Sequence, residues 1–223
     1  MTSTRRTASV AGAFFIVAAA AAILGLALYD PVLNDPGFLA GQGGEGQVLL
    51  GALFEVFVAI SVIGTAVTLY PVVKRQNEGI AMGYVAGRIL EATVIVVGLI
   101  ALLAVVTLRQ ESGDAASLPA LGEALVAVHD WTFLLGPGFA IGVNTLLLAY
   151  LMYRSQLVPR WIARIGLVGG PLLFASSTAI LLGAYEQLDP VAAALAFPVF
   201  AWEMSLAVYL IAKGFRAPLK EAA

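Results

Sequence analysis

The sequence predicts an all-α polytopic membrane protein, a bundle of six transmembrane helices with the N-terminus and C-terminus both cytoplasmic. Composition is the first observation behind this prediction. Of 223 residues, 61% are hydrophobic and 12% are charged, whereas soluble domains carry roughly 25% charged residues. The mean hydropathy is +0.94. A soluble domain of this size exposes too much surface to bury so many apolar side chains, so lipid must surround most of the chain.

Six apolar segments are the second observation. A spanning helix needs roughly 20 apolar residues, because the hydrocarbon core is about 30 Å thick. The segments cover approximately residues 9–28, 48–73, 80–108, 121–153, 161–184 and 191–212. Backbone groups in lipid must satisfy their own hydrogen bonds, which favours helices. We expect residues 1–223 to form a single transmembrane domain, with tilted or projecting ends in the long third and fourth segments.

The distribution of basic residues is the third observation. Ten of the twelve lie before the first segment, after the sixth, or in or beside the second and fourth connections: Arg5, Arg6, Lys74, Arg75, Arg154, Arg160, Arg164, Lys213, Arg216 and Lys220. The other connections are mainly acidic. Basic loops remain in the cytoplasm, so the pattern predicts cytoplasmic termini and a multi-pass protein of the cell inner (plasma) membrane.

Several ionisable side chains fall inside the predicted spans. A charge at the centre of a helix costs about 2.5–3.5 kcal/mol on insertion scales, so each one is a candidate for a functional site. The six candidates are Glu55, Arg88, Glu91, His129, Asp130 and Glu203.

Arg88 and Glu91 are three residues apart on the third predicted helix and therefore share a face, which Tyr84 extends by one turn. Glu91 and Glu203 are both expected near the middle of the membrane. An arginine fork can bind carboxylates from two helices, which would join the third helix to the sixth. Two carboxylates face one arginine, so either one is protonated or a cation completes the site. Both a structural ion-pair cluster and a proton or ligand site fit this pattern.

Glu55, His129 and Asp130 are expected at a similar depth near the outer leaflet, where they could meet. On the fourth predicted helix a polar or helix-breaking residue recurs every seven positions, at Glu123, Asp130, Pro137 and Asn144. Such spacing places them on one stripe, which we expect to face the bundle interior and to line a polar cavity open to the outside. Alternatively, His129 and Glu123 lie at the water interface and Asn144 alone is immersed.

Several kinds of site are excluded or disfavoured. The chain has no cysteine and one histidine, which excludes thiolate metal sites and a bis-histidine haem. No lysine lies within a predicted span, so a retinal Schiff base is excluded. One histidine with carboxylates is a weak ligand set, and we predict no metal and no cofactor. Without a basic run interleaved with aromatic residues, we also predict no nucleic-acid partner.

The chain resembles a bacterial integral-membrane family known as a domain of unknown function, number 4386. The matching stretches are Leu53-Phe54-Glu55, Leu69-Tyr70-Pro71, Glu78-Gly79 leading to Gly83-Tyr84, Arg88-Ile89-Leu90-Glu91, Leu157-Val158-Pro159-Arg160-Trp161, and Ala201-Trp202-Glu203 running into Lys213-Gly214-Phe215. The resemblance implies a six-helix membrane protein and no particular activity. It draws attention to Glu55, Arg88, Glu91 and Glu203, which fall inside these stretches.

Three functions fit the sequence. The one it favours is a small transporter-like or ligand-binding membrane protein with a polar or protonatable site. We expect that site to contain Arg88, Glu91, Glu203, Tyr84, Glu55, His129, Asp130 and Asn144. The alternatives are an intramembrane enzyme acting on a lipophilic substrate and a non-catalytic scaffold or partner subunit. The expected partners are membrane lipid and a small molecule or proton, and the sequence leaves a homo-oligomer open.

Overall fold

The structure is all-helical across the residues that the computed structural model describes, which are 3–35, 37–39, 43–110 and 118–216. In chain order the elements are α1 (Ser3–Leu28), α2 (Asp30–Asn34), α3 (Glu45–Val73), α4 (Glu78–Gln110), α5 (Leu118–Phe133), the π-helix η1 (Leu134–Ala140), α6 (Ile141–Ser155), α7 (Arg160–Leu181) and α8 (Pro190–Ala212). Six helices in this part of the chain, with α5, η1 and α6 counted as one, are long and apolar enough to cross a membrane. The predicted all-α bundle of six membrane-spanning helices is confirmed.

The spanning helices follow one another around a closed bundle. Helix α1 packs against α3, α3 against α4, and α4 against α5, η1 and α6. Helices α6, α7 and α8 continue the series, and α8 returns to pack against α1. The first and last helices of the sequence are therefore neighbours, and side chains from distant parts of the chain share the interior.

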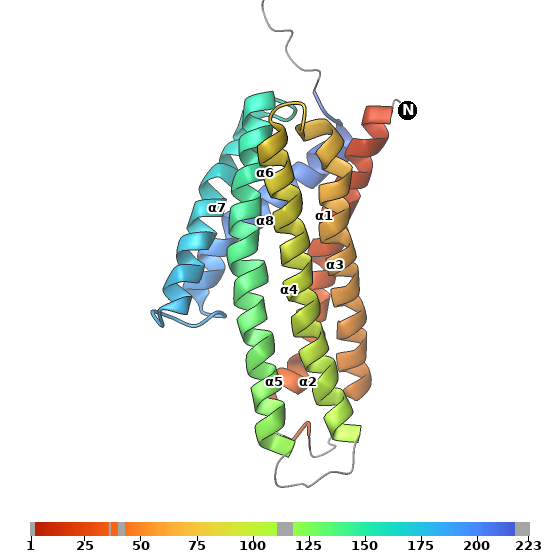
Figure 1. Ribbon diagram of the computed structural model, residues 1–223, viewed down its shortest axis with the longest axis vertical. Helices are drawn as coiled ribbons and strands as arrows, with labels where there is room; N and C mark the ends of the chain where they lie inside the picture. Colours follow the sequence, from red (N-terminus) through yellow and green to blue (C-terminus); the bar gives the residue numbers. More distant parts are fainter. Residues whose placement is uncertain (1–2, 36, 40–42, 111–117, 217–223) are drawn as a thin grey trace, which may run out of the picture.

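One end of the bundle carries the start of α1, the end of α8 and the connections α3–α4 and α6–α7 (Figure 1). We call this the terminal end and the opposite end the far end. The guanidinium of Arg5 donates to the carbonyls of Ile211 and Ala212 at the end of α8, at 2.7 and 3.0 Å. All the basic residues assigned above to the cytoplasmic side are adjacent to this end, except Lys220, which lies outside the described residues. The fold therefore places these basic residues at the same end of the bundle.

The fourth spanning helix is interrupted by a π-helix. A 38-residue stretch, Leu118–Ser155, runs the full height of the bundle, and Pro137 lies inside η1. Proline has no N–H to donate to the preceding turn, and a wider π-turn accommodates that loss. A π-helix also rotates the residues that follow relative to those before, which changes the face that α6 presents.

The spans differ in length, and this shapes the far end. Helix α4 has 33 residues and α7 has 22, which corresponds to roughly 50 and 33 Å at 1.5 Å per residue. The α7–α8 connection consequently lies well short of the far ends of α4 and α5 (Figure 1). Large apolar side chains point outward along the bundle, among them Ile23, Val67 and Ile100, each more than half exposed. An apolar outer surface of this kind is consistent with contact with lipid.

Candidate functional site

Arg88 on α4 bridges two carboxylates in the bundle interior. Its Nη1 contacts both oxygens of Glu91 at 3.1 Å, and its Nη2 donates to Oε1 of Glu203 on α8 at 2.8 Å. Arg88 is 3% exposed, Glu91 is fully buried, and the Glu203 side chain is 17% exposed. Arg88 therefore meets both carboxylates, as the ion-pair reading of the sequence predicts, and the three side chains join α4 to α8.

Asn144 on α6 supports Glu91 from the other side. Its Nδ2 donates to Oε2 of Glu91 at 2.8 Å, while its Oδ1 is buried and has no hydrogen-bond partner among the described residues. A Cβ atom placed on Gly87 would overlap this Oδ1. The glycine therefore makes room on α4 for the amide of α6. The amide in turn gives Glu91 a second donor, as a buried carboxylate requires.

Two aromatic rings and one hydroxyl complete the surroundings of Arg88. Its Nε donates to the Tyr84 hydroxyl at 3.3 Å, and that hydroxyl donates to Oγ1 of Thr65 on α3 at 3.3 Å. The guanidinium carbon lies 5.6 Å from the ring centre of Phe15 on α1 and 5.5 Å from that of Tyr84. Aromatic faces attract a cation. Helices α1, α3, α4, α6 and α8 thus all contribute to one polar cluster, which we call the Arg88 cluster.

Glu203 also faces a cavity. This inner cavity has a volume of about 290 Å³ and lies between α1, η1, α7 and α8. Its walls are mainly apolar, and they include Ala19, Leu173, Ala196, Val199 and Phe200. Among the described residues that line it, Glu203 is the only ionisable one. The Arg88 cluster is therefore in contact with an open space on the α8 side.

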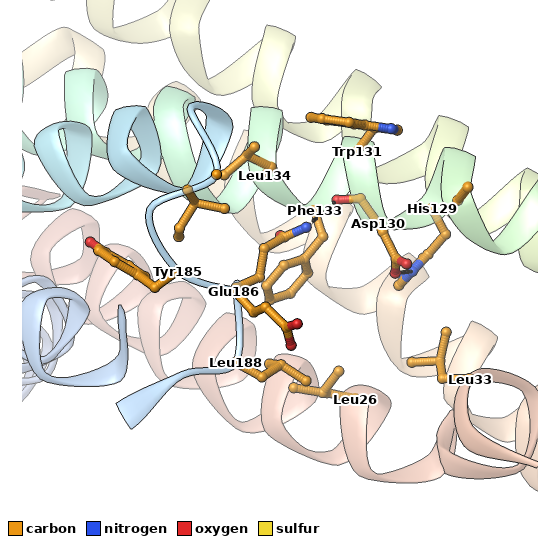
Figure 2. Close-up of a pocket in the computed structure, with 14 residues that line it drawn as sticks. Leu26, Leu33, His129, Asp130, Trp131, Phe133, Leu134, Tyr185, Glu186 and Leu188 are labelled. Atoms are coloured by element: carbon orange, nitrogen blue, oxygen red, sulfur yellow. Dashed lines mark hydrogen bonds and ion pairs between the residues drawn. The ribbon is translucent and has the colours of Figure 1, made fainter. Parts of the chain in front are cut away.

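A larger cavity continues toward the far end. This mouth cavity has a volume of about 580 Å³ and is lined by α1, α5 and the α7–α8 connection (Figure 2). Its ionisable lining residues are His129, Asp130, Tyr185 and Glu186. The two cavities share the side chains that separate them, namely Phe133, Leu134, Ile180 and Gln187. Gln187 donates to the carbonyl of Asp130 at 3.0 Å and so joins the α7–α8 connection to α5.

The three residues expected to meet near the outer leaflet are joined through a fourth, Tyr29. Its hydroxyl donates to Oε2 of Glu55 at 2.8 Å, and the ring of His129 meets its ring edge-on at 5.9 Å between centres. Asp130 only partly joins this group, because its side chain is 56% exposed and lies 3.4 Å from Nδ1 of His129. Burial raises the pKa of the Tyr29 hydroxyl, and the charge of Glu55 raises it further.

The expected polar stripe on the fourth helix does not hold along its whole length. Glu123 and Asp130 are exposed, Pro137 lines the inner cavity, and Asn144 is buried against Glu91. A spacing of seven keeps residues on one face only in an uninterrupted α-helix. The π-helix between Asp130 and Asn144 separates them. Of the two residues that the alternative reading places at the water interface, Glu123 is exposed and His129 is buried within the protein.

Sequence reasoning did not single out Tyr29, Phe15 or Thr65. Tyr29 lies at the end of the first span, where an aromatic residue usually indicates only the membrane interface. Phe15 and Thr65 are ordinary constituents of a spanning helix. Their proximity to Arg88 and Glu55 depends on which helices are neighbours, and that information is not contained in local spacing.

Comparison with known proteins identifies the family. The family model described as a domain of unknown function, DUF4386, matches residues 10–214. The chain belongs to this family. No curated protein and no solved structure matches it significantly. The family match covers every residue of the Arg88 cluster and both cavities, and it carries no activity.

Proposed function

We propose that this protein is a small transporter-like or ligand-binding membrane protein whose site is the Arg88 cluster. The observation that carries the proposal is the double role of Glu203. This carboxylate accepts a hydrogen bond from buried Arg88 and also lines the inner cavity. A ligand or proton entering the cavity would therefore meet the cluster at Glu203.

The charge balance of the cluster supports this function. One guanidinium faces two carboxylates, and isolated charges in a low-dielectric interior are costly. A proton on one carboxylate or a cation in the cavity restores neutrality. Intramembrane carboxylates of this kind commonly mark ion, proton or substrate pathways. Occupancy of the cavity would then be coupled to the ion pair that joins α4 to α8.

A cavity beside the cluster favours this function over the scaffold alternative. A scaffold needs its buried charges to be paired, but it gains nothing from open space next to one of them. The positive-inside rule assigns the far end to the outside of the cell. The mouth cavity, with His129 and Asp130, would then face the exterior, while Glu55 would contribute through Tyr29.

The absence of cysteine in the native chain permits a direct test of access. Ala196→Cys places a thiol in the inner cavity, and Ala207→Cys places one at a fully buried position on the same helix. Each variant is treated in intact cells with a membrane-impermeant charged thiol reagent. We expect the first thiol to react and the second to remain unmodified. Equal protection of both would contradict a cavity open to the outside.

Substitution of the carboxylates tests the chemistry. We expect Glu91→Gln and Glu203→Gln to abolish proton binding in the bundle, measured by infrared difference spectra of the protonated carboxyl band as pH is varied in lipid. Exposed Glu123, changed to Gln, is the matched control and should leave the buried signal intact. If both buried variants change only the thermal stability, the cluster is structural and the proposal fails.

A further inference from the structure

The inner cavity combines apolar walls with a single carboxylate at its base. We propose that it binds an amphiphilic organic cation, an ammonium group attached to an apolar body, with Glu203 as its counter-ion. This inference rests on the proposed function and names the class of ligand. The cavity volume of about 290 Å³ is at the lower end of the roughly 300–1,000 Å³ found for ligand pockets, which limits the body to a small ring or short chain.

The hydrogen bonds of the Arg88 cluster leave one oxygen of Glu203 free for such a ligand. Arg88 uses Nη1 for Glu91, Nε for Tyr84 and Nη2 for Oε1 of Glu203. No described residue donates a hydrogen bond to Oε2 of Glu203. With both carboxylates ionised the cluster carries one excess negative charge. An ammonium group in the cavity would neutralise that charge and donate to this oxygen.

The walls favour an organic cation over a metal ion. A calcium ion takes six to eight oxygen ligands, and magnesium takes an octahedral set. The inner cavity offers few oxygens, and its serines are already engaged. The Ser176 hydroxyl accepts from Tyr185 at 2.8 Å and that of Ser177 donates to the Leu173 carbonyl at 2.9 Å. An organic ammonium has at most three N–H donors, fewer than the six to eight oxygens that a calcium ion takes, and its apolar body gains from contact with Ala196, Val199 and Phe200.

The route into the cavity has the same electrostatic preference. Asp130 and Glu186 line the mouth cavity (Figure 2), and the described lining of both cavities contains no lysine or arginine. A cleft with one sign of charge concentrates ligands of the opposite sign. An organic anion would meet these acidic side chains first and Glu203 at the base. The whole path therefore favours cations.

Three small ligands of matched shape test the proposal: benzylammonium, benzyl alcohol and benzoate. Binding to the full chain in lipid nanodiscs is measured by titration calorimetry at neutral pH, with empty nanodiscs as the blank. We expect the ammonium to bind most tightly, and Glu203→Gln to weaken it about 10-fold or more, as for loss of a charged hydrogen bond. Ala196→Phe, which fills the cavity and keeps the carboxylate, should also abolish binding. Glu123→Gln should have no effect.

The outcomes separate this inference from the proposed function. If benzyl alcohol or benzoate binds as tightly as the ammonium and is lost in Ala196→Phe, the cavity is a ligand site but the cation class is wrong. If none of the three binds above the blank, the inference also fails, and the thiol labelling at position 196 decides separately whether the cavity is accessible. Far-ultraviolet circular dichroism and melting temperature verify that each variant is folded.

Discussion

At the residue scale, Arg88 determines the chemistry of the interior. A buried arginine is stable only when its donors are used, and here Glu91, Glu203 and Tyr84 each accept from a different guanidinium nitrogen. Removing one member of a buried ion pair typically costs about 3–5 kcal/mol, because the partner charge is left without compensation. The Arg88 cluster thus joins α4 to α8 and contains two carboxyl groups for one guanidinium.

Gly87 and Asn144 provide a prediction about close packing. We expect Gly87→Ala to destabilise the protein by about 1–3 kcal/mol, because the new methyl group overlaps the Asn144 amide. In an Asn144→Ala background the same change should be neutral or stabilising, since alanine is the better helix former by about 1 kcal/mol. Equilibrium unfolding in detergent micelles measures both effects. Equal costs in the two backgrounds would show that the side chains do not meet.

Tyr29 provides a prediction about pH. The pKa of its hydroxyl is raised above the ordinary value of 10.0 by burial and then by Glu55, so the folded state favours the protonated form. Its contribution to stability is complete below pH 10.0 and falls above it, by up to about 1.4 kcal/mol per pH unit. The Tyr29→Phe variant should therefore lose less stability than the native protein as the pH rises above 10.0. Unfolding measured between neutral and alkaline pH tests it, and unchanged slopes would contradict the burial of the Tyr29 hydroxyl beside Glu55.

At the element scale, the sequence predicts the helices better than their faces. Hydropathy locates all six spans, because lipid requires long apolar segments with internally satisfied backbones. The short helix α2 is missed, since five residues carry no periodic signal. The predicted polar stripe on the fourth span does not continue to Asn144 on one face, because the π-turn at Pro137 rotates α6 relative to α5. A proline indicates a local irregularity, but not whether the chain kinks or widens there.

The crossing of α6 and α7 also depends on small residues and gives a further prediction. A Cβ on Gly170 would lie 2.7 Å from the carbonyl oxygen of Gly142, which is backbone and cannot move aside. We expect Gly170→Ala to lower the free energy of unfolding by about 1–3 kcal/mol. The matched control is Gly46→Ala in the first turn of α3, where a Cβ meets nothing within 4 Å. This substitution should leave the free energy of unfolding unchanged or raise it. Similar effects at both positions would contradict this close approach.

At the scale of the whole molecule, the closed order of helices explains why the site is assembled from distant segments. Arg88 and Glu91 could be placed on one face from their spacing, and Glu203 at a similar depth from its position in the last span. Their contact requires α8 to return beside α1, which no local pattern contains. The cavities likewise depend on where α1, α5 and the α7–α8 connection diverge, so they could not be located from the sequence.

The central claim is that Arg88 holds Glu203 of α8 to α4 inside the bundle. A double-mutant cycle with Arg88→Met, Glu203→Gln and the combined variant measures this coupling through the free energy of unfolding in micelles. We predict an interaction energy of about 1.5–3 kcal/mol, as for a buried hydrogen bond between charged groups. The same cycle with exposed Glu123→Gln in place of Glu203→Gln should give none. Additive effects of Arg88→Met and Glu203→Gln would show that the two side chains do not interact and would contradict the account.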